Sequence, residues 1–227
     1  MDRSYPSLTS FDPRLDILPA AQRAVWPRLV HLPIDAVLYR GTAIALRLGH
    51  RASVDFDLFL PRSFEPGEMR REVAGLGPFE VVRTAVDTLS VIVDDVWVSL
   101  FGVKLASVAS PEVAADIGLP VASLLDVGAT KMQTIVDRAE SRDYLDIAEI
   151  LAAGLPLADL LGAAQVVFGP SFSPMLALKA LTSYTDGSLD EVPIDVRQTL
   201  EAAAGALRRI TVMDARATTV TPSAPGT

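Results

Sequence analysis

Two aspartates separated by a single residue, Asp55 and Asp57, are the strongest chemical signal in this chain. They lie in an apolar run typical of a β-strand, in which residues two apart point to the same face. Two carboxylates held this close repel each other unless a cation lies between them. Mg²⁺ suits such a pair, because it usually binds one or two protein carboxylates together with substrate phosphates. The spacing therefore predicts a metal site, although two solvent-exposed acids on a strand would show the same pattern.

The dipeptide Gly41-Thr42 stands upstream of the aspartates, between an apolar run at residues 36–39 and a helix-like segment at residues 43–48. The free N–H groups and the dipole of a helix N-terminus favour phosphate binding. The backbone N–H groups of Gly41 and Thr42, with the Thr42 hydroxyl, are therefore candidate contacts to a triphosphate. A plain helix start is the alternative, since threonine is a good N-cap in its own right.

Arg51 and Ser53 lie between this turn and the two aspartates. Arg51 could pair with a phosphate or with a nearby carboxylate, and both residues are candidate nucleotide contacts. A phosphate-binding turn followed by metal-binding carboxylates is the set of groups needed to transfer a nucleotidyl group.

A second group of charged residues begins at Lys131. On one continuous helix, Lys131, Arg138 and Arg142 would share a face as a basic stripe, with Asp146 about one turn further on. A helix break near Glu140-Ser141 is the alternative and would separate these side chains. The functional interpretation is that Lys131 contacts the triphosphate while Asp146 holds Lys131 or a nearby arginine in place. The alternative is salt bridging on a solvated face, worth only ~0.2–0.5 kcal/mol per pair. Asp143 could belong to this group or could cap the helix that follows.

The elements that must position these residues change type along the chain. Residues 14–31 are expected to be helical, and residues 36–101 alternate strands and helices in the α+β manner. From residue 123 the hydrophobic period is helical. We therefore predict three parts, which are a nucleotidyltransferase-like core at 14–110, a helical C-terminal region at 111–212 and a disordered tail at 213–227.

Within the core, the pattern after the aspartates predicts one helix and three short strands. The helix is expected at residues 64–75, and the strands at residues 79–84, 89–93 and 96–101. Asp94-Asp95 is a plausible two-residue hairpin turn between the last two strands. The two tryptophans, which are Trp26 and Trp97, are expected in the core.

Composition sets limits on the class of protein. The 227 residues include 20 basic and 28 acidic side chains, for a formal net charge of −8, so the chain is not a default nucleic-acid binder. Without cysteine there can be no disulfide and no thiolate metal site, which fits a cytoplasmic protein. The N-terminal residues lack the apolar segment of a signal peptide.

The mean hydropathy of +0.34 makes a membrane segment worth testing. The most apolar window, residues 151–169, contains Pro156, Asp159 and Gln165. It is therefore not a clean apolar span of about 20 residues. We expect a helix that ends near Ala153 and a second, buried helix that begins at Pro156.

The order of these motifs resembles the nucleotidyltransferase superfamily that includes DNA polymerase beta. Gly41-Thr42 is followed after twelve residues by Asp55-Phe56-Asp57. The closer resemblance is to the AbiEii/AbiGii toxin family, through the sequence LYRGTAIALRLGHRASVDFDLF, a later Lys131 and the run Arg142-Asp143-Tyr144-Leu145-Asp146. The likeness covers roughly residues 14 to 152.

This resemblance implies a nucleotidyltransferase-like mixed sheet with flanking helices and a helical C-terminal half. It implies Mg²⁺-dependent transfer of an NMP from an NTP to a hydroxyl of a tRNA or a protein, in a toxin with a cognate antitoxin. The implied catalytic residues are Asp55, Asp57, Lys131 and Asp146, the first two of which would bind the metal. The implied nucleotide contacts are Gly41, Thr42, Arg51, Ser53, Arg138 and Arg142.

Two positions depart from the family pattern. Arg40 stands where the family usually has the first glycine of its turn, and it could either block the phosphate or contact it as a cation. Ser99 stands where many active members place a third acid. A catalytically inactive fold used as a nucleotide-sensing or protein-binding module is therefore an alternative function. A nucleotidyltransferase acting on a small molecule is a third.

Overall fold

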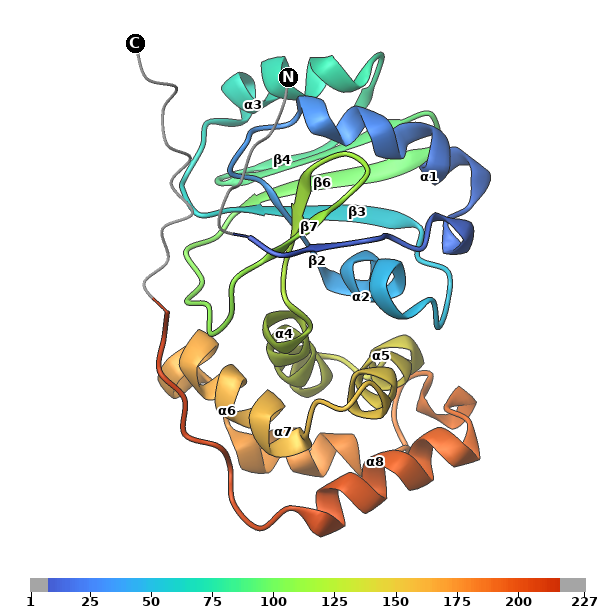
Figure 1. The fold of residues 1–227 in the computed structure, drawn as a ribbon, viewed down its shortest axis with the longest axis vertical. Helices are drawn as coiled ribbons and strands as arrows, with labels where there is room; N and C mark the ends of the chain where they lie inside the picture. Colours follow the sequence, from blue (N-terminus) through green and yellow to red (C-terminus); the bar gives the residue numbers. More distant parts are fainter. Residues whose placement is uncertain (1–7, 217–227) are drawn as a thin grey trace. The chain divides into compact units, whose positions relative to one another are not determined.

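The computed structural model describes residues 8–216, which divide into two compact units. Unit 1 holds residues up to 105 together with residues 110–122, and it carries all of the strands. Unit 2 holds residues 106–109 and 123–216 of the described chain, and it is helical (Figure 1).

Unit 1 is built on a mixed sheet of eight strands in the order β1-β7-β8-β2-β3-β6-β5-β4. The central strand β3 pairs antiparallel with β2 and parallel with β6, so the predicted α+β fold with a mixed sheet is confirmed. The strands are β1 (Ser10–Phe11), β2 (Val37–Tyr39), β3 (Asp55–Leu60), β4 (Glu80–Ala85), β5 (Thr88–Val93), β6 (Val96–Gly102), β7 (Glu112–Ala114) and β8 (Leu119–Val121).

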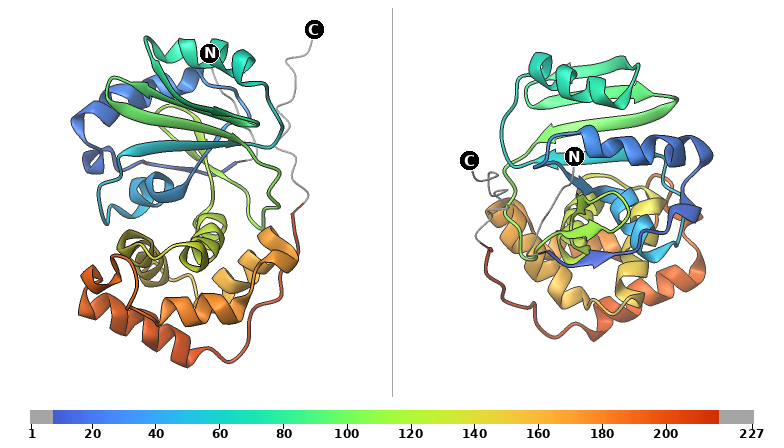
Figure 2. Two further views of the ribbon diagram at one scale, coloured as in Figure 1. Left: turned by 180° about the vertical axis from the view of Figure 1, so that it is seen from behind. Right: turned by 45° about the horizontal axis from the view of Figure 1, so that its top comes forward.

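Helices lie on both sides of this sheet. Helices α1 and α3 lie on one side, while α2 lies on the other (Figures 1 and 2). Strand β3 follows the strict alternation of a half-buried strand, with Phe56, Leu58 and Leu60 completely buried. The helical segments of unit 1 are η1 (Leu15–Ile17), α1 (Ala20–Val25), η2 (Trp26–His31), α2 (Arg40–Leu48), α3 (Pro66–Val73) and η3 (Ala74–Leu76).

The hairpin between β5 and β6 turns at Asp94 and Asp95, as the sequence predicts. Val93 pairs with Val96, and the two aspartates between them have φ angles of 47° and 64°. Positive φ at both central residues is the requirement of the hairpin turn whose twist matches the flanking strands. Aspartate tolerates this conformation better than most residues do.

Unit 2 is a group of helices in which α4 begins at a well-formed N-cap. The Ser123 hydroxyl accepts a hydrogen bond from the Asp126 backbone N–H, and the Asp126 carboxylate accepts hydrogen bonds from the backbone N–H groups of Val108 and Ala109. This carboxylate therefore ties residues 106–109 to unit 2. The helical segments are α4 (Leu124–Asp137), α5 (Ser141–Ala152), α6 (Leu157–Phe168), η4 (Gly169–Ser171), α7 (Pro174–Leu181), η5 (Leu189–Glu191) and α8 (Ile194–Ala206).

The structure places residues 110–122 in unit 1, whereas the sequence analysis starts the helical region at residue 111. Strands β7 and β8 explain the difference, because β8 pairs with β2 and thereby extends the sheet. These strands have only three residues each, too few to show a period. From residue 217 onward, the predicted tail lies outside the described residues.

The two tryptophans differ in their surroundings. Trp26 is buried, as expected, with its ring centroid 5.9 Å from that of Phe56. The prediction for Trp97 is wrong, because its side chain is 43% exposed. Trp97 pairs in register with Asp55, so its side chain extends from the same, more open face of the sheet.

No single helix among residues 8–216 is both long and apolar enough to cross a membrane. Two consecutive helical segments, Ser141–Ala152 and Leu157–Ser171, together meet the length and composition of a membrane span, but they are bent by 118° at the break between them.

Candidate active site

The two predicted metal ligands share one face of β3. Asp55 and Asp57 are partly exposed and alternate with the completely buried Phe56 and Leu58. The side chain of Asp57 is 17% exposed. The apolar residues fix the rotation of the strand, because turning it over would bring them out of the core. The carboxylates are therefore held on the open face by the packing of the opposite face.

The register of the sheet defines which residues flank Asp57. Tyr39 of β2 pairs with it on one side and Ser99 of β6 on the other, and Ser99 pairs in turn with Ser90 of β5. The hydroxyl oxygens of Ser99 and Ser90 lie 2.9 Å apart, and both side chains are buried. Ser99 thus occupies the position on the strand beside Asp57 where the family resemblance predicts a third acid. Within residues 8–216, no group of three or more histidine, cysteine or acidic side chains could hold a metal.

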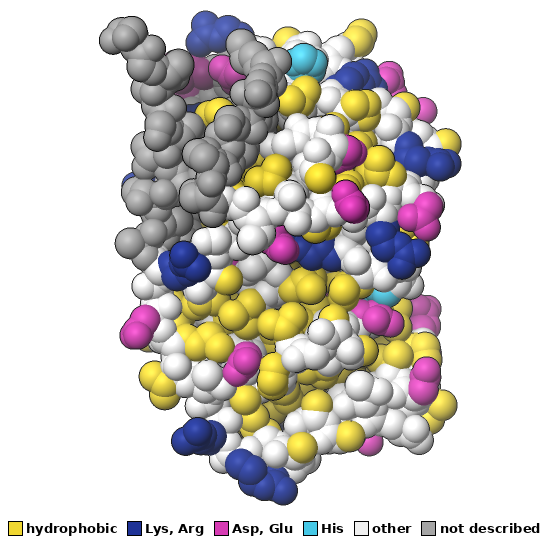
Figure 3. Space-filling view, viewed as in Figure 1, with side chains coloured by type: hydrophobic (Ala, Val, Ile, Leu, Met, Phe, Trp, Pro, Cys, Tyr) yellow, Lys and Arg dark blue, Asp and Glu magenta, His cyan; other side chains and the backbone are white. Residues whose placement is uncertain are grey.

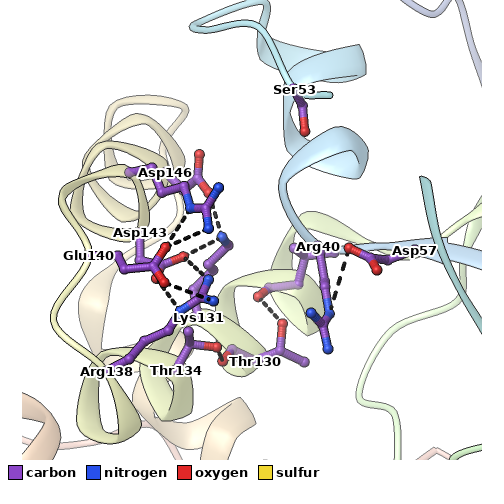
Figure 4. A network of polar contacts seen from close by, with 12 residues as sticks. Arg40, Ser53, Asp57, Thr130, Lys131, Thr134, Arg138, Glu140, Asp143 and Asp146 are labelled. Atoms are coloured by element: carbon purple, nitrogen blue, oxygen red, sulfur yellow. Dashed lines mark hydrogen bonds and ion pairs between the residues drawn. The ribbon is translucent and has the colours of Figure 1, made fainter. Parts of the chain in front are cut away.

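Arg40, the first residue of α2, lies beside the metal-site candidate Asp57. Its Nε is 3.8 Å from Oδ2 of Asp57 (Figure 4). The guanidinium carbon also lies over two rings, 5.8 Å from the centroid of Phe59 and 5.0 Å from that of Phe101. The φ angle of Arg40 is 60°, which is uncommon for a residue with a side chain. Arg40 is thus held over the same open face by one carboxylate and two rings.

The hydroxyl of Thr42 is directed into the protein rather than out of it. Its Oγ1 lies 2.5 Å from the carbonyl oxygen of Asp55 and 2.8 Å from Oγ of Ser53, and the residue is only 2% exposed. A hydroxyl has one proton, so Thr42 donates to Asp55 and Ser53 donates to Thr42. Thr42 and Ser53 therefore join the start of α2 to the start of β3. The groups of this turn that could donate hydrogen bonds to a phosphate are therefore the backbone N–H groups, rather than these two hydroxyls.

Gly41 allows a close approach at the start of α2. A Cβ at this position would lie 2.7 Å from an Nη atom of Arg51 and 3.3 Å from Oγ of Ser53. Any larger residue would have to displace the arginine. The structure therefore brings Arg51 against the helix N-terminus, where the N–H groups and the helix dipole favour an anion.

Lys131 lies in a buried ion cluster in unit 2. Its Nζ is 2.7 Å from Oδ1 of Asp143 and 2.5 Å from Oδ2 of Asp146 (Figure 4). The lysine side chain is 6% exposed, and neither carboxylate has any exposed surface. The hypothesis that Asp146 holds Lys131 matches this geometry. Asp143 contacts the same ammonium group and does not cap α5, whose N-cap is Glu140.

The predicted basic stripe is not formed, because the helix breaks between Lys131 and Arg142. Helix α4 ends at Asp137, and Arg138 has extended backbone angles of −152° and 152°. This break turns the Arg138 Nε to within 3.0 Å of Oδ2 of Asp143. Arg142 instead pairs with Glu140 at 2.6 Å. The three positive charges of Lys131, Arg138 and Arg142 are balanced by the three negative charges of Glu140, Asp143 and Asp146, so the group is not a basic surface.

Two contacts were not expected from the sequence. The Arg40–Asp57 pair joins α2 to β3, so no pattern of neighbouring residues in the sequence predicts it. The contact of Asp143 with Lys131 was predictable from the sequence, because Asp143 and Asp146 are three residues apart and so share a face of α5. The structure thus defines two separate sets of predicted residues, one in unit 1 and one in unit 2.

Comparison with known proteins shows the fold of this chain and its family. The chain has a nucleotidyltransferase fold: it superimposes on MenT4, a nucleotidyltransferase toxin from Mycobacterium tuberculosis H37Rv, with a TM-score of 0.53 and 19% identity over 84% of this chain and 87% of that one. A sequence model described as "Nucleotidyl transferase AbiEii toxin, Type IV TA system" matches residues 81–206, more than half of the chain. The chain therefore belongs to the AbiEii nucleotidyl transferase toxin family.

A relative in Aquifex aeolicus (strain VF5) is an uncharacterized protein that is 30% identical over 130 residues. This match spans 56% of the present chain and 63% of the relative, which is less than two thirds of its length. The family match begins at residue 81, so Asp55 and Asp57 lie before the matched residues.

Proposed function

We propose that this protein transfers a nucleotidyl group from an NTP to a hydroxyl of a tRNA or a protein, with pyrophosphate as the leaving group, and that it acts as a toxin. The observation that carries this proposal is the pair Asp55 and Asp57 on the open face of β3, joined through Thr42 to the N-terminus of α2. Membership in a family of nucleotidyl transferase toxins supports the same reaction class.

The donor set fits a magnesium ion that arrives with its nucleotide. Two carboxylates with no third acid nearby are too few for an all-protein cage, but Mg²⁺ usually binds one or two carboxylates plus phosphate oxygens. Asp55 and Asp57 would hold the ion. When bound, it would polarise a phosphoryl oxygen and offset the charge that develops during transfer.

The remaining residues of unit 1 would bind and orient the triphosphate. The N–H groups at Gly41 and Thr42 are in the first turn of α2, where N–H groups have no partner within the helix, and Arg51 lies against Gly41. Ser53 and Thr42 would act indirectly, by fixing the start of α2 relative to β3. Positioning of this kind, together with electrostatic stabilisation, supplies most of the catalysis in phosphoryl-transfer enzymes.

The acceptor and the antitoxin are inferred from the charge of the chain and from its family, rather than from the geometry of the site. A net charge of −8 weakens non-specific binding to RNA, because such binding depends on neutralising phosphates. On the face drawn in Figure 3, basic and acidic side chains of the described residues are interspersed. We therefore expect the acceptor to be selected by specific contacts. A cognate antitoxin is the partner that fits the family.

Two specific observations favour a second function. Arg40 already lies beside Asp57, and Ser99 occupies the position of a third acid. A nucleotide-sensing or protein-binding module that has lost catalysis would show both features. Such a module would bind NTP in a metal-dependent manner without turnover.

Incubation with each α-labelled NTP, Mg²⁺ and cell extract tests transfer and identifies the acceptor. We expect one NTP to label one class of macromolecule, and Asp57→Asn to abolish the labelling. Asp95→Asn, the same change at an exposed turn of the same unit, is the matched control and should label normally. NTP binding without any label would favour the inactive module instead.

A further inference from the structure

The most unusual feature of the site is that one carboxylate, Asp57, has both a fixed cation and a serine in place of an acid beside it. Asp57 has the Arg40 guanidinium nearby, with 3.8 Å between Nε and Oδ2. On the neighbouring strand it has Ser99 in register. Arg40 adds a positive charge beside Asp57, and Ser99 lacks the negative charge that an acid would add. Both residues therefore change the net charge that a metal–nucleotide complex would meet.

Ser99 cannot be a strong metal ligand in its present surroundings. It is 8% exposed, and its hydroxyl lies 2.9 Å from that of Ser90, which is 4% exposed. Magnesium prefers carboxylates, carbonyls and water, and a neutral hydroxyl adds no negative charge. The two residues that flank Asp57 in register, Tyr39 and Ser99, therefore add no negative charge to those of Asp55 and Asp57.

Arg40 is held in place by more than its charge. Phe59 is two residues from Asp57 on the same face of β3, and Phe101 pairs with Phe59 in register. The guanidinium lies over both rings, so it stays on the open face near Asp57. Arginine is always protonated in proteins, and its planar fork suits both carboxylate and phosphate oxygens. A positive charge is thus a permanent part of this site.

We propose that the site takes a single divalent cation and that the Arg40 guanidinium supplies the positive charge that a second metal ion supplies in two-metal sites. Two-metal sites hold their ions about 3.5–4 Å apart between shared ligands. Here two carboxylates, one divalent ion and one guanidinium give a local formal charge of +1, whereas a second divalent ion would raise it to +3. This inference rests on the proposed function, since it concerns the same metal–nucleotide site.

The test counts Mn²⁺ ions per bound nucleotide, using the full chain, Mn²⁺ and a non-hydrolysable α,β-methylene NTP, by electron paramagnetic resonance and calorimetry. Wild type should retain one Mn²⁺ per bound nucleotide. The double variant Arg40→Gly/Ser99→Asp, which removes the fixed cation and restores the third acid, should retain two. The matched control Arg40→Gly/Ser99→Asn adds no charge and should retain one.

Two ions in wild type would overturn the single-metal inference and leave the proposed function intact. No Mn²⁺ retained with the nucleotide would overturn the metal site itself, and with it the proposed function. The two failures are therefore distinguishable.

Because an aspartate at the buried position of Ser99 could prevent folding, Arg40→Gly alone provides a second measurement. Without nucleotide, Asp57 would no longer share its charge with the guanidinium, and Mn²⁺ should bind on the order of tenfold more tightly. Arg40→Lys should leave the affinity within about threefold of wild type, because it retains the charge. Equal Mn²⁺ affinity in wild type and Arg40→Gly would show that the guanidinium does not act at the metal position.

Discussion

At the scale of single residues, the backbone of Arg40 is the clearest site of strain. With φ at 60°, a side-chain-bearing residue costs roughly 1–2 kcal/mol relative to its usual conformation, whereas glycine adopts this angle freely. Arg40→Gly and Arg40→Ala both remove the guanidinium, but only glycine relieves the strain. We expect Arg40→Gly to be about 1 kcal/mol more stable than Arg40→Ala in urea unfolding. Equal stabilities would contradict a strained backbone at this residue.

We expect the stability of unit 2 to depend on Lys131. Lys131→Met would leave Asp143 and Asp146 buried without their shared cation, and removing one member of a buried ion pair costs about 3–5 kcal/mol. Lys179→Met changes an exposed lysine of α7 and should cost no more than about 0.5 kcal/mol. Denaturant unfolding compares the two variants.

Adding Asp146→Asn to Lys131→Met should recover part of that loss, because it removes one of the two buried carboxylates that would have lost Lys131. A double variant that is less stable than Lys131→Met would show that repulsion between the carboxylates is not the main cost.

At the scale of elements, the parts with a clear period were predictable. Strand β3, the hairpin at Asp94-Asp95 and helix α2 follow from alternation, turn residues and helix signals in the sequence. The face of β3 that carries the aspartates also follows from its alternation. These features depend on neighbours in the sequence, which is why they can be predicted.

Other elements depend on contacts distant in sequence. Strands β7 and β8 are defined by pairing with each other and with β1 and β2, not by their own three residues. The break after Asp137 contains neither glycine nor proline, so the sequence left a break near Glu140-Ser141 as an alternative to one continuous helix. It is accompanied by the Arg138–Asp143 ion pair, a contact that exists only in the folded unit. The Arg40–Asp57 pair belongs to the same class.

Helix α5 carries a tyrosine whose ionisation should affect alkaline stability. Burial raises the pKa of Tyr144 from 10.0 to about 12, with smaller contributions from Tyr184, Asp143 and Asp186. Between pH 10 and 12 the unfolded chain loses this proton while the folded chain keeps it. The folded state therefore binds more protons, and stability falls as pH rises through this window, by about 2–3 kcal/mol. Below pH 10 the contribution is fully present.

Tyr144→Phe should remove this dependence. At pH 8 the variant should be less stable than wild type by about 1 kcal/mol, since it loses the 2.9 Å hydrogen bond from the tyrosine hydroxyl to the Ala180 carbonyl. Towards pH 12 the difference should shrink and then change sign. Urea unfolding at pH 8 and pH 11.5 measures both values. A constant difference across this range would contradict the raised pKa.

At the scale of the whole molecule, the metal–nucleotide complex should act as a stabilising ligand. A ligand at 100 times its dissociation constant stabilises the folded state by about 2.7 kcal/mol. We expect NTP with Mg²⁺ to give wild type and Asp95→Asn this gain, and Asp55→Asn or Asp57→Asn little or none. Thermal unfolding with and without Mg²⁺ measures the effect. The same shift in all four proteins would place the nucleotide away from β3.

The central claim, nucleotidyl transfer at Asp55 and Asp57, is tested most directly by comparing two labels on the same NTP. Purified protein, Mg²⁺ and the acceptor identified in extract are incubated with α-labelled or γ-labelled nucleotide. Nucleotidyl transfer predicts that the α label enters the acceptor while the γ label leaves in pyrophosphate, and that Asp57→Asn loses this labelling while Asp95→Asn keeps it. Entry of the γ label into the acceptor, or undiminished α labelling by Asp57→Asn, would contradict the account.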